Sequence, residues 1–136
     1  MENNERKYSV LVVEDEKPLS DALEEKLSEE GFDVLRAENG EEGVKLALSR
    51  HPDLILLDLI MPKIDGLTML KMLRKDEWGS HATVIILTNI SDESKVAEVL
   101  SSGFSNINDT YEYLVKTDWS LDAVVDKIKQ KLQINK

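Results

Sequence analysis

Short apolar runs that alternate with helical stripes are the feature that most constrains the fold of this chain. Each run is short and bounded by polar or turn residues, which predicts a buried strand. The five runs are Ser9–Val13, Phe32–Ala37, Leu54–Leu57, Thr83–Leu87 and Tyr113–Val115. Strands alternating with helices favour right-handed crossovers and a parallel sheet covered on both faces. The nearly continuous apolar character of the runs agrees, because parallel strands are usually buried on both sides.

The segments between the runs carry apolar residues at helical spacing, and local signals mark where several of these helices start and stop. Gly31 is expected to end the first helix. Asn39 is expected to cap the start of the second, which should end at Pro52. A third helix should follow the Asp65-Gly66 turn, and Ser91 and Ser120 are predicted to cap the fourth and fifth. The pattern therefore predicts five strands and five helices.

Length, charge and the lack of cysteine narrow the class of protein. A chain of 136 residues fits a single domain, with an ordered core expected at about residues 7–133. A formal net charge of −10 argues against direct binding to nucleic acid or to an anionic membrane. No apolar stretch approaches the length of a membrane span, and the absence of cysteine excludes disulfides and thiolate chemistry. A cytoplasmic location is the expectation.

Polar residues follow four of the five predicted strands directly. They are Glu14, Asp15, Asp58, Thr88 and Lys116. The carboxyl ends of parallel strands lie on one edge of an open sheet, and ligands bind at that edge. Asp58 is the most telling of the five, because it lies within an apolar stretch where an ionised side chain is costly. Each residue alone has an ordinary explanation as a surface or strand-end residue, but their joint position indicates a site.

The chemistry of these side chains points to phosphoryl transfer. Three carboxylates close together repel one another unless a cation lies among them, and Mg²⁺ prefers oxygen ligands. An aspartate can serve as a nucleophile, which makes Asp58 the candidate acceptor. Lys116 and the metal would neutralise charge on the phosphoryl oxygens, and the hydroxyl of Thr88 could donate a hydrogen bond to one of them.

These residues lie in motifs that resemble the receiver domains of two-component response regulators. The matching segments are Val12–Glu16, Leu56–Pro62, Asp65–Gly66, Ile86–Thr88 and Tyr113–Lys116. They occur in the expected order from about Tyr8 to the last helix. The resemblance implies an α/β, flavodoxin-like, doubly wound fold with a five-stranded parallel sheet in the order 2-1-3-4-5 and five helices.

The resemblance also implies a role for each site residue. Asp58 would be the phosphoacceptor, Asp15 a direct ligand of Mg²⁺, and Glu14 a ligand through water, with Mn²⁺ as a substitute metal. The backbone carbonyl of Ile60 would complete the protein's share of the coordination. Lys116 would hold the phosphoryl group, while Thr88 and Tyr113 would form the switch.

The same resemblance implies the partners and the signalling role. The phosphodonor would be a sensor histidine kinase or a histidine phosphotransfer protein. The domain would catalyse its own phosphorylation and slow dephosphorylation without being a turnover enzyme. Phosphorylation would change the face formed by the fourth helix, fifth strand and fifth helix, for a downstream protein target, an output domain or a homodimer. Neither direct nucleic-acid contact nor a membrane is expected, and the sequence leaves open whether the domain stands alone.

Two departures from the family pattern affect the region around the fifth strand. Thr117 stands where the family usually has proline after the lysine, and we expect a cis bond between Lys116 and Thr117. Tyr113 lies ten positions after Gly103, a longer spacing than is usual in the family. We expect Gly103–Glu112 to be a mobile, exposed loop or an extension of the fourth helix.

Three alternatives share parts of this pattern. A haloacid dehalogenase-like enzyme would carry a second aspartate two residues after the nucleophile, where this chain has Ile60. A flavin-binding domain would need a phosphate-cradling loop after the first strand, and Glu14-Asp15-Glu16 has the wrong charge for that. A degenerate receiver that only binds a partner would not retain the full set of site residues. A receiver domain is therefore the preferred interpretation of the sequence.

Overall fold

A five-stranded parallel sheet forms the centre of the computed structural model, which describes residues 7–59, 66–88, 111–116 and 119–133. The strands are β1 (Ser9–Val13), β2 (Asp33–Ala37), β3 (Leu54–Leu57), β4 (Val84–Thr88) and β5 (Tyr111–Val115). They are arranged in the order β2-β1-β3-β4-β5, and every neighbouring pair is parallel. This confirms the predicted flavodoxin-like order.

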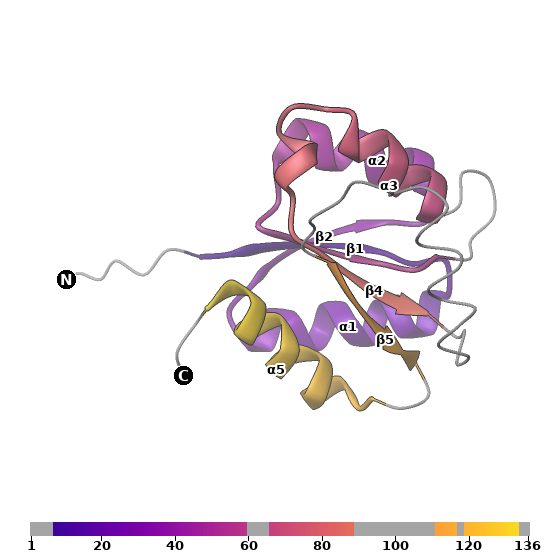
Figure 1. Ribbon diagram of the computed structural model, residues 1–136. Coiled ribbons are helices and arrows are strands. Elements are labelled where there is room, and N and C mark those ends of the chain that lie inside the picture. Colours follow the sequence, from indigo (N-terminus) through magenta and orange to yellow (C-terminus); the bar gives the residue numbers. More distant parts are fainter. Residues whose placement is uncertain (1–6, 60–65, 89–110, 117–118, 134–136) are drawn as a thin grey trace.

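Helices cover both faces of the sheet (Figure 1). The described α-helices are α1 (Lys17–Glu29), α2 (Gly40–Arg50), α3 (Gly66–Arg74) and α5 (Leu121–Leu132). In Figure 1, α2 and α3 lie above the sheet, and α1 and α5 lie below it. The predicted fourth helix falls in residues 89–110, outside the described part of the chain. No helix of the described ranges combines the length and apolar character that crossing a bilayer requires.

Alternate residues of the strands divide the interior into two apolar layers. Leu57 belongs to the layer shared with α2 and α3, while its neighbour Leu56 belongs to the layer shared with α1 and α5. Both side chains are almost completely buried. A strand whose successive side chains are buried on opposite faces needs apolar residues at every position, which is why these runs do not alternate with polar residues.

Three of the local signals in the sequence have the predicted roles, while Ser91 lies outside the described residues. The side chain of Asn39 accepts a hydrogen bond from the backbone N–H of Glu42 at the start of α2. Ser120 caps α5 in the same way, through the N–H of Ala123. The backbone of Gly31 has a φ of +94°, a conformation that glycine adopts without steric cost, just after α1 ends.

Strand boundaries differ from the sequence expectation at three places. Phe32 is buried but precedes β2, because its N–H donates to the carbonyl of Leu27 at the end of α1. The fourth strand is displaced by one residue and includes Thr88. The fifth begins at Tyr111 rather than Tyr113, so the prediction of a loop or helix was wrong for the last two residues of Gly103–Glu112. Residues 103–110, and the bond to Thr117, lie outside the described residues.

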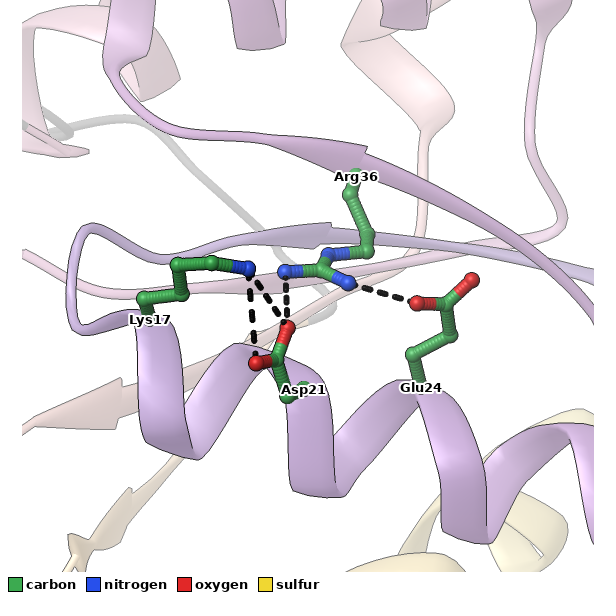
Figure 2. A network of polar contacts seen from close by, with 4 residues as sticks. All are labelled: Lys17, Asp21, Glu24 and Arg36. Atoms are coloured by element: carbon green, nitrogen blue, oxygen red, sulfur yellow. Dashed lines mark hydrogen bonds and ion pairs between the residues drawn. The ribbon is translucent and has the colours of Figure 1, made fainter.

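The edge strand β2 is tied to α1 by charged side chains (Figure 2). Arg36 of β2 donates to Asp21 at 2.7 Å and to Glu24 at 2.5 Å, and Lys17 also donates to Asp21 at 3.1 Å. A second set of ion pairs joins α1 to α5, with Lys26 to Asp122 at 2.6 Å. Exposed pairs of this kind contribute little individually, so they orient helices that apolar packing holds in place.

Candidate functional site

The carboxyl edge of the sheet brings Asp58 next to Glu14. Asp58 follows β3 directly, and its backbone N–H donates to the carbonyl of Val13 at 3.0 Å. Glu14 follows β1, and its N–H donates to the carbonyl of Ala37 at 3.0 Å. Each residue therefore continues the strand ladder by one hydrogen bond before the chain turns away. This fixes the backbone of both acidic residues at neighbouring positions of the edge.

Three carboxylates meet at this edge and form a set of oxygen donors. One carboxylate oxygen from each of Glu14, Asp15 and Asp58 lies within 4.8 Å of the other two. Glu14 and Asp58 are buried, at 3% and 4% exposed, whereas Asp15 is exposed. Carboxylates this close repel one another, and all three carry the oxygen ligands that Mg²⁺ prefers. The donor set fits a divalent cation.

Lys116 brings a positive charge to the same carboxylates from the other end of the chain. It follows β5, and its side chain is 10% exposed. Its Nζ donates to Glu14 Oε2 at 3.1 Å, to Glu16 Oε1 at 2.9 Å and to Asp58 Oδ2 at 3.3 Å. The ammonium is therefore within direct reach of the predicted acceptor, as phosphoryl binding at Asp58 would require.

Burial and crowding change the protonation of the site. Burial, together with the negative charge of Asp58, raises the pKa of Glu14 to about 7, although hydrogen bonds from Lys116 and the N–H of Glu16 oppose the rise. Burial alone would lower the pKa of Lys116, but its hydrogen bonds to Glu16 and Glu14 and the charge of Asp58 raise that pKa above its ordinary value. Lys116 is thus held as a cation, and Glu14 gains a proton readily when no metal is bound.

The remaining predicted residues are described to different extents. Thr88 ends β4, is fully buried, and pairs with Val115, the residue before Lys116. Tyr113 lies in β5, where it pairs with Ile86. Ile60 is outside the described residues. The structure thus brings together four of the predicted side chains in direct contact or near contact, namely Glu14, Asp15, Asp58 and Lys116.

Glu16 also contacts Lys116, a role that the residue pattern alone does not predict. In the sequence it is the last residue of the acidic run Glu14-Asp15-Glu16 and of the segment Val12–Glu16 that resembles receiver domains. Its carboxylate accepts the shortest of the three hydrogen bonds from Lys116, and its backbone N–H donates to Glu14 Oε2 at 3.1 Å. The one sequence signal for this role is its position next to Glu14 and Asp15 at a strand end, which a surface glutamate also shares.

Most of the chain is similar in sequence to a family of known proteins. Residues 10–117 match the family model described as the response regulator receiver domain. The chain is 42% identical over 89 residues to a probable transcriptional regulator ycf27 of Porphyridium aerugineum, which covers 65% of this chain and 36% of that protein. It is 36% identical over 94 residues to the DNA-binding dual master transcriptional regulator RpaA of Synechocystis, covering 69% of this chain and 39% of that protein. The matches thus span well under half the length of these relatives.

Solved structures of response regulators superpose on nearly the whole chain. The receiver domain of the Francisella response regulator 1452 superposes with a TM-score of 0.80 at 30% identity, covering 96% of this chain and all of that one. The response regulator TrrA of Thermotoga maritima, solved in complex with Mg²⁺ and BeF, gives a TM-score of 0.75 at 35% identity, covering 91% and 98%.

Proposed function

This chain belongs to the response regulator receiver family, and from that premise we propose that Asp58 accepts a phosphoryl group from a phosphohistidine donor. One observation carries the proposal: Lys116 donates at 3.3 Å to a buried Asp58 carboxylate that also lies against Glu14 and Asp15. Response regulators are signalling proteins, so the reaction would set a state of the domain and would not turn over a substrate.

The transfer exchanges one bond to phosphorus for another. The P–N bond of the donor phosphohistidine breaks, and its electron pair stays on the imidazole, which takes a proton from solvent. A P–O bond forms to a carboxylate oxygen of Asp58. Lys116 would stabilise negative charge on the phosphoryl oxygens, and Thr88 would donate a hydrogen bond to one of them. Slow hydrolysis of the acyl phosphate would return the domain to its starting state.

Asp15 would hold Mg²⁺ directly and Glu14 would hold it through water, with Asp58 in the same metal site. The backbone carbonyl of Ile60 would complete the protein's share of the coordination. Support comes from the oxygen donor set of the three carboxylates and from the Mg²⁺ complex of TrrA. A bound Mg²⁺ ion, or Mn²⁺ as its substitute, supplies positive charge that offsets the charge of the phosphoryl oxygens.

Phosphorylation would be read out through Thr88 and Tyr113. A buried threonine hydroxyl drawn towards the phosphoryl group would leave space for the aromatic ring, which gives a two-state switch. The face formed by the fourth helix, β5 and α5 would change, for a protein target, an output domain or a homodimer. Beryllofluoride should therefore shift amide resonances of α5 as well as those near Asp58; shifts confined to the Asp58 edge would contradict the switch.

The names of the relatives suggest the setting of this switch. Several are transcriptional regulators, and this chain matches 36% and 39% of the length of the two described above. We infer that the whole chain is one receiver domain that serves a sensor histidine kinase or histidine phosphotransfer protein in the cytoplasm. Its output would be gene regulation through a separate DNA-binding part, while the acidic receiver itself would not contact DNA.

Intact mass after incubation with acetyl phosphate and Mg²⁺ tests the acceptor. The wild-type chain should gain one phosphoryl group, and Asp58→Asn should gain none. Asp33→Asn is a matched control, because Asp33 is an exposed aspartate that pairs with Lys7 away from the site. EDTA should abolish the gain. Phosphorylation that persists in Asp58→Asn, or that EDTA does not reduce, would refute the proposal.

A further inference from the structure

Glu16 occupies an N-cap position that its side chain does not use for capping. It precedes α1, its backbone is extended, and its side chain makes no hydrogen bond to the N–H groups of the first turn. The carboxylate instead accepts from Lys116 Nζ at 2.9 Å while remaining 53% exposed. Helix capping therefore does not explain the direction of the Glu16 side chain. Its hydrogen bond to Lys116 explains that direction.

All three N–H donors of the Lys116 ammonium are occupied by carboxylates. A lysine ammonium carries three N–H donors. In this structure they face Glu14, Glu16 and Asp58, with Glu16 at the shortest distance and Asp58 at the longest. A phosphoryl group that arrives on Asp58 must therefore take a donor that a carboxylate already holds.

Of the three carboxylates, Glu16 is the one that can release Lys116 at low cost. Glu14 is buried, and without Lys116 its carboxylate would keep the hydrogen bond from the N–H of Glu16 but lose its ion pair, which is costly for a buried charge. Asp58 is the acceptor itself. The half-exposed carboxylate of Glu16 can be solvated by water as soon as the ammonium moves away.

We propose that the Glu16 carboxylate holds one N–H donor of Lys116 in the unphosphorylated domain. It then competes with the incoming phosphoryl group for that donor. This inference rests on the proposed acceptor role of Asp58. Glu16 is a positioning residue that acts through Lys116, and it restrains phosphorylation. Because the Glu16 carboxylate is half-exposed, its ion pair with Lys116 should slow phosphorylation only about two- to fivefold.

The test compares Glu16→Gln with Glu38→Gln at saturating Mg²⁺. Glu38 is an exposed glutamate that follows β2 at the same edge, and Lys116 has ion pairs only with Glu14, Glu16 and Asp58 among the described residues. Both variants remove one negative charge. Glu16→Gln should be phosphorylated by acetyl phosphate about two- to fivefold faster than Glu38→Gln, and should bind beryllofluoride more tightly by a similar factor.

A second background isolates the dependence on Lys116. In Lys116→Met, adding Glu16→Gln should change the beryllofluoride affinity no more than adding Glu38→Gln does. Equal rates for the two glutamine variants, a slower Glu16→Gln, or an effect that survives in Lys116→Met would overturn the inference. If wild type itself fails to gain a phosphoryl group on Asp58, the proposed function fails instead, so the two failures are distinguishable.

Discussion

At the scale of single residues, the site concentrates negative charge in a place with little water. Glu14 and Asp58 are both buried, and Lys116 alone among the described cations bonds to them directly. One ammonium cannot neutralise the three acids that surround it. The site therefore carries net negative charge, which a bound divalent cation would neutralise.

Glu14 should make the metal-free domain less stable as the pH rises. Its pKa is about 7 in the folded protein and 4.5 in the unfolded chain, so the folded state binds more protons between these values. The free energy of unfolding should therefore fall as the pH increases from about 4.5 to about 7. Glu14→Gln should flatten this dependence.

Urea denaturation in EDTA at several pH values measures how the free energy of unfolding depends on pH in wild type and in Glu14→Gln. Glu25→Gln, which alters an exposed glutamate of α1, should follow the wild-type curve. A Glu14→Gln curve parallel to wild type would show that Glu14 does not titrate in this range. Added Mg²⁺ should stabilise wild type most at the higher pH, because binding there displaces no proton.

At the scale of elements, the start of α3 packs directly against the backbone of Asp58 and Leu59. The N–H of Gly66 donates to the carbonyl of Leu59 at 3.0 Å, which joins the first residue of α3 to the residue after the acceptor. A Cβ on Gly66 would lie 2.7 Å from the Cα of Leu59 and closer still to the carbonyl oxygen of Asp58. Glycine is therefore required here for close backbone approach.

Gly66→Ala should destabilise the domain and impair phosphorylation together. The clash is with backbone, so relief requires Asp58 and Leu59 to move, at a cost of about 2 to 3 kcal/mol in unfolding free energy. Gly43→Ala is the matched control: its Cβ would meet the flexible side chain of Met69, at 2.7 Å from Sδ. Denaturation and phosphorylation rate should both change much less in Gly43→Ala. Similar losses in the two variants would contradict the argument.

At the scale of the whole molecule, the sheet separates two apolar layers that must both be sealed. Leu56 and Leu57 are adjacent in β3, and each is almost fully buried in a different layer. Folding therefore depends on the helices of both faces docking on the same strands. Such a sheet has no face that can tolerate exposure, in contrast to many antiparallel sheets.

Leu56→Ala and Leu57→Ala should each cost about 2 to 5 kcal/mol, since either leaves a cavity in a close-packed layer. This is a large part of the 5 to 15 kcal/mol that typically stabilises a domain. Leu48→Ala, at a site that is 36% exposed, should cost well under half as much. Chemical denaturation followed by circular dichroism measures all three. A well-tolerated substitution at either β3 position would mean that its layer is loosely packed.

Local patterns in the sequence predict the kinds of elements and the candidate residues at the carboxyl edge of the sheet. Apolar runs predict strands, Asn39 and Ser120 mark helix starts, and residues directly after strands must lie at the carboxyl edge. The order of the strands came from resemblance and was confirmed. Asp58 and Lys116 could be paired in advance because an edge of a parallel sheet collects the ends of all its strands.

Features that depend on partners far away in the chain cannot be predicted from local sequence and become visible in the folded structure. Strand β5 starts at Tyr111 because Tyr111 and Glu112 pair with Val84 and Ile85, and no local pattern carries that pairing. The bond between Glu16 and Lys116 joins residues 100 positions apart. A surface glutamate and a site glutamate look alike in sequence, and the direction of a side chain is set by the charge that the fold brings within its reach.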